Sequence, residues 1–253
     1  MIGTSEDLER QYSRRVPSDP SEVRPERVLK KALQHLKEKW KNEKNYKHIC
    51  EQFKTVRQDL IVQRIANQFA VEVYETHARI ALENYDLWEF NACQTQLSRL
   101  YSHLEDKEGS APKTCLEFLA YRLLYFLYNE VKQTVTEIVC GLNEKTRKHP
   151  ALSHAIQVFE SLENFNYSKL FRLSEGSPNM GDYLMCLFLP KIRKRALIVI
   201  TTAYRPTVTL EFLSKALHFK NKKEFNDFVG ENVVLVKNSK SDVDCKGTLE
   251  KLG

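Results

Sequence analysis

Apolar residues recur at three- and four-residue intervals along most of the chain, which is the pattern of amphipathic helices. The spacing predicts a first helix beginning at Pro25 and further helices over 45–63, 65–83, 87–104, 112–128, 131–141, 150–163, 166–174 and 179–203. Pro190 lies inside the last of these and should kink or interrupt it. A succession of short helical hairpins predicts a helical-repeat solenoid, in which each pair buries its apolar face on the next.

The pattern changes near the end of the chain. A helix is expected around 208–218, and a second begins at Asn221, a good N-cap, and ends at Gly230. The short apolar run 233–236 reads as a strand, 237–244 as a polar loop and 245–250 as a strand that pairs back. This order predicts a winged helix. We therefore expect an extended arm over 1–23, a helical-repeat domain over 24–205 and a winged-helix domain over 206–253.

The most specific sequence motifs lie in the predicted helices between residues 56 and 101. They read Val-Arg-Gln-Asp-Leu-Ile-Val-Gln over 56–63, Tyr-Glu-Thr-His-Ala-Arg-Ile-Ala-Leu-Glu over 74–83 and Glu-Phe-Asn-Ala-Cys-Gln-Thr-Gln-Leu over 89–97. In these stretches the chain resembles the Sac/GANP family of PCI-domain proteins. The resemblance implies an all-α fold, with a TPR-like helical-repeat solenoid followed by a winged helix that carries a small β-sheet.

The same resemblance implies a function. Proteins of this kind are non-enzymatic scaffolds that pair with a second PCI-domain protein, together with the small acidic Dss/Sem protein, directly or through the partner. The compact form of the chain looks closer to the transcription-and-splicing branch than to the large mRNA-export scaffolds. The expectation is a role in nuclear mRNA biogenesis, through transcription elongation, splicing or export. The alternative is a protein-interaction subunit of an assembly like the proteasome lid or the signalosome, without direct nucleic-acid binding.

Composition and motifs give no sign of a membrane protein or an enzyme. The start lacks a secretory signal pattern, and the longest apolar run, 183–189, is too short to span a bilayer. The six cysteines never form a C-x-x-C motif, so reduced thiols in the nucleus or cytoplasm are expected, with no metal or other cofactor. His77 falls on an apolar stripe and reads as a core histidine with a hydrogen-bond partner. We expect Arg57, Asp59 and Glu75 to be structural.

The net charge of +6 is concentrated in two places. Residues 24–48 carry nine Lys or Arg against three acids, and residues 187–206 carry five against none. An uneven basic distribution favours an anionic partner, although an exposed, solvated face is the ordinary explanation for any single cluster. We take that ordinary explanation for the lysines of 24–48, with an acidic protein or RNA as the minority interpretation.

The second basic stretch is the best nucleic-acid candidate, because it adjoins the predicted winged helix. The predicted phosphate-binding residues are Lys191, Arg193, Lys194, Arg195, Lys220, Lys222, Lys223, Lys237 and Lys240. Contacts to RNA or DNA phosphates would show little sequence preference and strong salt dependence. In the same terminal domain, Phe219, Phe225 and Phe228 are predicted to be partly exposed and to bind the protein partner, because one small core has little room to bury them.

Overall fold

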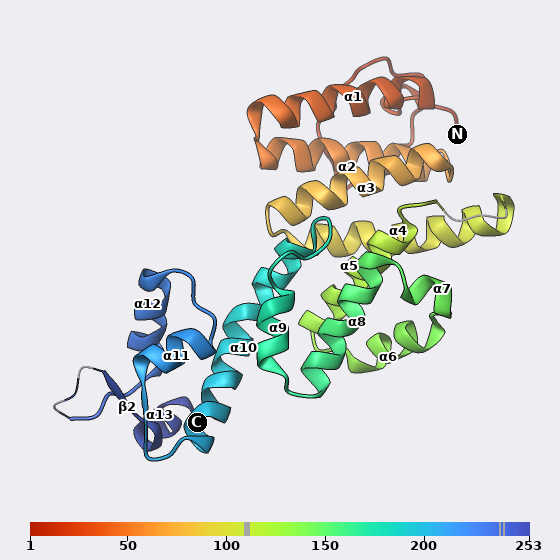
Figure 1. Ribbon diagram of the computed structural model, residues 1–253. Coiled ribbons are helices and arrows are strands. Elements are labelled where there is room, and N and C mark those ends of the chain that lie inside the picture. Colours follow the sequence, from red (N-terminus) through yellow and green to blue (C-terminus); the bar gives the residue numbers. More distant parts are fainter. Residues whose placement is uncertain (109–111, 238, 240) are drawn as a thin grey trace. The chain divides into compact units, whose positions relative to one another are not determined.

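The computed structural model describes residues 1–108, 112–237, 239 and 241–253 (Figure 1). The chain is mostly helical, which confirms the predicted fold class at that level. It forms two compact units, Met1–Arg122 and Leu123–Gly253, a division that the sequence analysis did not predict. No described helix is both long enough and apolar enough to cross a membrane.

The first unit is a series of helices in contact with their neighbours. After a short 3₁₀ turn, η1 (Pro20–Glu22), come α1 (Glu26–Glu43), α2 (Tyr46–Val62), α3 (Gln68–Glu83), α4 (Leu87–Glu108) and the start of α5 (Cys115–Tyr128). Figure 1 shows α1 to α4 following one another as layers, and each contacts the next. The apolar stripes predicted from the sequence form the core between them, with Phe53, Phe90 and Leu97 at most 1% exposed.

The N-terminal arm is extended but is held against the first two helices. The Gly3 amide donates to Gln63 Oε1 at 3.0 Å, and a Cβ on Gly3 would lie only 2.2 Å from the Val23 carbonyl oxygen, so glycine is required there. Further along, Arg10 and Arg24 both reach the carboxylate of Asp59, at 2.8 Å and 2.6 Å. Asp59 and Arg24 are completely buried, which agrees with the structural role predicted for Asp59.

Arg57 and Glu75 also have partners within the helical packing, which agrees with the structural role predicted for them. The Arg57 guanidinium pairs with Glu89 on α4 and lies over the ring of Tyr74 at 5.6 Å. Glu75 accepts a hydrogen bond from the Tyr101 hydroxyl at 2.8 Å and pairs with Arg79 at 3.3 Å. Each charge therefore has partners within the helical packing, as groups near a buried face require.

The second unit contains α6 (Lys132–Gly141), α7 (Glu144–Arg147), α8 (Pro150–Glu163), α9 (Tyr167–Leu173) and α10 (Gly181–Ala203). The four-residue α7 was not predicted. Helix α10 continues through Pro190, contrary to the expected interruption. Phe188 and Ile192, on either side of the proline, are 4% and 2% exposed, so packing on both sides holds the helix together despite the lost backbone donor.

Three helices end in the same kind of turn. After α3, α5 and α8 an asparagine is followed by a residue with positive φ, and the next amide bonds back to the last helical turn; these residues are Asn84–Tyr85, Asn129–Glu130 and Asn164–Phe165. The side-chain amide of each asparagine also donates to the backbone carbonyl four residues earlier, at 2.8 Å. Two backbone hydrogen bonds close each turn; after α8 they run from Asn166 N to Ser161 O at 2.9 Å and from Phe165 N to Leu162 O at 3.3 Å. This pair of hydrogen bonds defines a Schellman-type helix end.

The strand predictions for the terminal segment were wrong in detail. The order is β1 (Thr207–Thr209), α11 (Leu210–Ala216), α12 (Lys222–Asn232), β2 (Asp242–Asp244) and α13 (Cys245–Leu252). The two strands pair antiparallel with Val208 opposite Val243, while residues 233–236 contribute a single bridge from Leu235 to Val243. Residues 245–250 are helical, because the Asp244 side chain caps α13 by accepting from the amides of Lys246 and Gly247.

Candidate nucleic-acid interface

Helix α10 buries one row of apolar residues and exposes three of its basic ones. Ile192, Ala196 and Leu197 are at most 2% exposed and face the core of the second unit. Lys191, Lys194 and Arg195 are exposed, as the helical phase predicted. Three of the predicted cations are therefore brought together on the solvent side of one helix.

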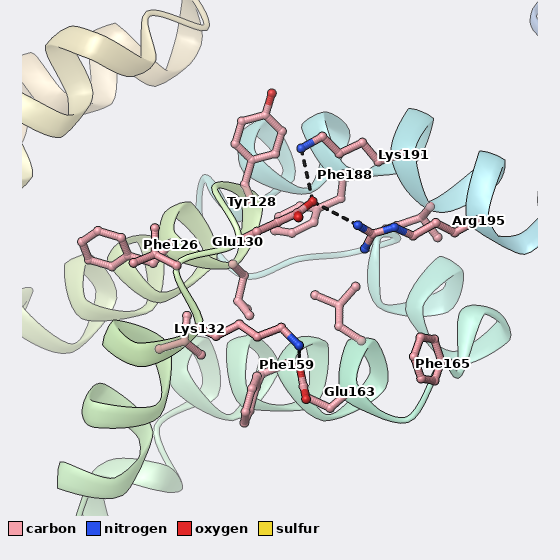
Figure 2. Close-up of a pocket in the computed structure, with 15 residues that line it drawn as sticks. Phe126, Tyr128, Glu130, Lys132, Phe159, Glu163, Phe165, Phe188, Lys191 and Arg195 are labelled. Carbon is pink, nitrogen blue, oxygen red and sulfur yellow. Dashed lines mark hydrogen bonds and ion pairs between the residues drawn. The ribbon is translucent and has the colours of Figure 1, made fainter. Parts of the chain in front are cut away.

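One carboxylate lies between two of these cations. Glu130, at the turn after α5, accepts from Arg195 Nη2 at 3.1 Å and lies 3.5 Å from Lys191 Nζ (Figure 2). The ammonium of Lys191 is also 5.0 Å from the centre of the Tyr128 ring. All three charged side chains are about half exposed, at 52–53%, so these pairs are weak and exchangeable. Lys194 has no ion pair with a described residue.

Arg193 does not belong to this exposed row. It is 7% exposed, its Nη2 and Nε donate to the carbonyls of His218 and Leu217 at 3.2 and 3.3 Å, and it also pairs with Glu224. Its guanidinium lies 3.8 Å from the centre of the Phe219 ring. Arg193 thus joins α10 to the terminal segment, and the expectation that it would be available to phosphates is not met.

The remaining predicted cations are scattered over the terminal segment. Lys220 pairs with Glu175 at 2.5 Å, whereas Lys222 and Lys223 are exposed at the start of α12. Lys237 is exposed beyond the Leu235 bridge. Lys240 lies outside the described residues.

The predicted exposure of the three phenylalanines is wrong for two of them. Phe225 and Phe228 are 7% and 9% exposed, and their rings lie 5.2 Å from that of Phe219. They belong to the small core of the terminal segment, which also buries Leu213, Leu217 and Val243. The exposed aromatic residues there are Tyr204 and Phe212, at 52% and 38%, with ring centres 5.0 Å apart. The sequence analysis did not single out this pair, because only the packing shows which side of α11 is left uncovered.

A pocket of about 380 Å³ lies beside the cationic face of α10 (Figure 2). The turn after α5, the start of α6, the end of α8 and α10 enclose it, and its lining includes five aromatic residues: Phe126, Tyr128, Phe159, Phe165 and Phe188. Lys191, Arg195 and Glu130 lie on one side, and Lys132 pairs with Glu163 at 3.3 Å on another. No sequence pattern indicated this pocket, because its residues come from four separate elements.

A second cluster, in the first unit, has the residue types of a metal site. Atoms of His77, Glu89 and Cys93 lie within 4.8 Å of one another. Two cations already occupy the carboxylate, because Arg57 and Lys54 both pair with Glu89. Burial raises the pKa of the Cys93 thiol to about 12, so it is protonated at neutral pH and poorly suited to bind a metal.

His77 itself is in the core, as predicted, but without the predicted hydrogen-bond partner. Both ring nitrogens are buried and have no hydrogen-bond partner among the described residues, and the ring stacks on Phe53 with centres 4.9 Å apart. Burial, with Arg57 and Lys54 nearby, lowers the pKa of His77 well below its usual value, so the ring is neutral. A fully enclosed neutral imidazole is a packing residue and not an accessible base.

Comparison with known proteins gives the family. A family model described as "SAC3/GANP family" matches residues 7–238, so the chain belongs to the SAC3/GANP family. A THP3 homolog of Schizosaccharomyces pombe is 46% identical over 229 residues, covering 90% of this chain and 56% of that protein. The SAC3 family protein A of Arabidopsis thaliana is 40% identical over 219 residues, 86% of this chain and 21% of that protein.

Another relative is the Leukocyte receptor cluster member 8 homolog of Xenopus laevis. It is 39% identical over 254 residues, covering 100% of this chain and 31% of that protein. The chain therefore spans about half or less of the length of these relatives. The comparison confirms the family resemblance read from the motif-rich helices between residues 56 and 101.

Proposed function

We propose that the chain is a non-enzymatic PCI scaffold that pairs with a second PCI-domain protein and provides part of a nucleic-acid-binding platform in nuclear mRNA biogenesis. Membership of the SAC3/GANP family supports the scaffold role and its setting in transcription elongation, splicing or export. The observation that carries nucleic-acid binding is the row of exposed cations, Lys191, Lys194 and Arg195, on one side of α10.

The arrangement of elements supports the proposed PCI architecture. Neighbour-to-neighbour packing of α1 to α4 is what a helical-repeat array requires, and the similar turns after α3, α5 and α8 agree with it. Helix α10, β1, α11, α12, the Leu235 bridge and β2 follow the order of a winged helix with a very small sheet. In this architecture α10 is the first helix of the winged helix as well as the last of the array, and its cations lie where the two parts meet in sequence.

The proposed binding mode is electrostatic contact with the phosphate backbone. Lysine and arginine contacts to phosphates supply affinity without reading bases, and affinity falls as salt rises because counterions are released. Lys222, Lys223 and Lys237 are further exposed cations of the second unit that could contact phosphates. The expected ligands are RNA and single-stranded DNA, bound with little sequence preference.

Glu130→Gln should strengthen this binding. The substitution removes the negative charge shared by Lys191 and Arg195, so both cations become available to phosphates. Because each of the two exposed pairs contributes roughly 0.2–1 kcal/mol, the expected gain in affinity is about two- to thirtyfold. Fluorescence anisotropy with a labelled single-stranded RNA, titrated over a range of salt concentrations, measures it.

Glu144→Gln is the matched control for this experiment, because Glu144 is an exposed carboxylate of the same unit that pairs only with Lys148 among the described residues. It changes the net charge equally and should leave the affinity nearly unchanged. If the wild-type chain, alone and with its PCI partner, shows no salt-dependent binding, nucleic-acid binding is refuted. The protein-only scaffold, as in a lid- or signalosome-like assembly, then becomes the better description.

For the protein partner, the exposed pair Tyr204 and Phe212 is the proposed contact in place of the buried phenylalanines. Exposed aromatic residues at the centre of an interface commonly carry much of the binding energy. The partner is a second PCI-domain protein, with the small acidic Dss/Sem protein joining directly or through it.

Phe212→Ala should weaken co-purification with a co-expressed PCI partner by about tenfold or more in affinity, because an aromatic anchor is lost. Deleting residues 207–253 is a poorer test, since it would uncover the side of α10 that holds Arg193. Phe165→Ala, at an exposed ring on the α8–α9 turn, is the matched control and should leave pairing intact. Unchanged pairing in a folded Phe212→Ala variant would place the interface elsewhere.

A further inference from the structure

Phosphate binding to the exposed cations of α10 does not use the aromatic lining of the pocket beside them. We propose that this pocket binds one unstacked nucleobase of a single-stranded nucleic acid, while the adjacent phosphates contact the cations on its rim. The inference rests on the proposed function and adds a base-binding site to it. Phosphate contacts alone would require only the exposed face of α10 and no aromatic hollow.

The lining of the pocket suits a flat ring. The rings of Tyr128 and Phe188 meet edge to face, with centres 5.8 Å apart and an interplanar angle of 78°. Phe188 and Ile192, which are 4% and 2% exposed, form the floor of the pocket. Phe165, at the α8–α9 turn, is 71% exposed and borders the pocket in Figure 2. An exposed aromatic ring beside an apolar hollow is the arrangement on which proteins stack unpaired bases, because every base has a π-face.

The rim supplies charge of the correct sign. Lys132, Lys191 and Arg195 all line the pocket, against two carboxylates, Glu130 and Glu163. The ion pairs between them involve side chains that are 49–80% exposed, so phosphates can replace the carboxylates at little energetic cost. The phosphates of a nucleotide whose base is bound in the pocket would therefore lie close to these cations.

The size of the pocket favours a base over a partner helix. A volume of about 380 Å³ is near the lower end of the range for small-molecule sites, which runs from about 300 to 1,000 Å³. A helix would instead need an elongated groove with anchors at several turns. A nucleotide also brings a flat ring and a phosphate together, which matches an aromatic pocket with cations on its rim.

Two probes with the same number of phosphates separate base binding from phosphate binding. One is single-stranded oligothymidylate of about ten nucleotides, a length within the usual site sizes. The other is the same oligomer with abasic deoxyribose at every position. The full 253-residue chain should bind the thymidylate about tenfold more tightly than the abasic oligomer, because a stacked base adds free energy that phosphates cannot supply.

Phe165 variants locate the effect. Phe165→Ala should abolish most of the difference between the probes while leaving the affinity for the abasic oligomer unchanged. Phe165→Tyr keeps an aromatic ring and should retain the preference. Trp88→Ala removes a ring that is 89% exposed in the first unit and should change neither affinity. Because Phe165 is largely exposed, circular dichroism and melting should be near wild type in both Phe165 variants.

The outcomes distinguish the two proposals. Equal affinity of the wild-type chain for both probes refutes the base site but leaves phosphate binding standing. Equal loss for both probes in a folded Phe165→Ala variant refutes it too, since a base-specific contact cannot act on the abasic oligomer. If Phe165→Ala instead weakens only association with the protein partner, the pocket binds protein and the inference fails. If the wild-type chain binds neither probe, whether alone or with its PCI partner, the proposed nucleic-acid function fails together with the base site.

Discussion

Asp59→Ala should lower the melting temperature of the protein by about 6–20 °C, the largest stability effect that we expect from one substitution. The completely buried carboxylate of Asp59 accepts from Arg24 Nε at 2.6 Å and from Arg10 Nη2 at 2.8 Å. Removing it leaves the Arg24 guanidinium buried without its counter-charge, which typically costs about 3–5 kcal/mol; for chains of this size each kcal/mol corresponds to about 2–4 °C.

The neighbours of Asp59 explain why little else could compensate. Arg24 is 0% exposed, and its remaining nitrogens donate to Thr55 Oγ1 at 2.7 Å and the Leu8 carbonyl at 3.0 Å, both neutral acceptors. Burial already lowers the pKa of Arg24, with Asp59 opposing that shift, so the loss of Asp59 removes the main support for the charged form. The substitution should also release the N-terminal arm at Arg10.

Thermal melting by circular dichroism measures the effect, with two comparisons. Asp59→Asn keeps an acceptor and should be less harmful than Asp59→Ala. Glu211→Ala removes a carboxylate that is 80% exposed and pairs only with Lys215 among the described residues, so it should have little effect. Below its melting transition the Asp59→Ala protein should still bind RNA normally. Native stability combined with a selective loss of binding would show instead that Asp59 is a functional residue.

Reversing Lys191, Lys194 and Arg195 to Glu should weaken binding to single-stranded RNA by about ten- to hundredfold, or roughly 0.5–1 kcal/mol for each lost phosphate contact. All three side chains are exposed on α10, so the fold should tolerate the change. The slope of log affinity against log salt should also flatten by about 0.7 for each lost contact with a single strand. Fluorescence anisotropy in a salt series measures both quantities.

The matched control reverses Lys31, Lys41 and Lys47, exposed lysines of the first unit, to Glu. This triple variant changes the net charge by the same amount but leaves α10 intact. If both variants lose affinity equally, the total charge of the protein and not a local surface governs binding. An unchanged affinity and salt slope in a correctly folded α10 variant would mean that its cations are only a solvated face.

The sequence alone predicted the features that depend on neighbouring residues. Helix positions follow from three- and four-residue spacing, and the observed bounds of α2, α8 and α10 lie close to the predicted ones. The family was recognisable from the sequence motifs in α2 to α4. The exposure of Lys191, Lys194 and Arg195 was also predictable, because helical phase fixes which residues share a side of one helix.

Features that join distant segments were decided by the tertiary structure. Helical phase places Arg193 on the same side as the buried Ala196 and Leu197, but only the tertiary structure shows that carbonyls 24 and 25 residues away take its hydrogen bonds. Phe225 and Phe228 are buried because Phe219 folds back on them, and β2 pairs with a strand before α11. The pocket takes Glu130 and Phe165 from two separate turns. Local periodicity determines which residues of a helix can face a neighbouring element, but long-range packing determines which element that is. For that reason the sequence alone determined the helices and the family, whereas the tertiary structure determined the site.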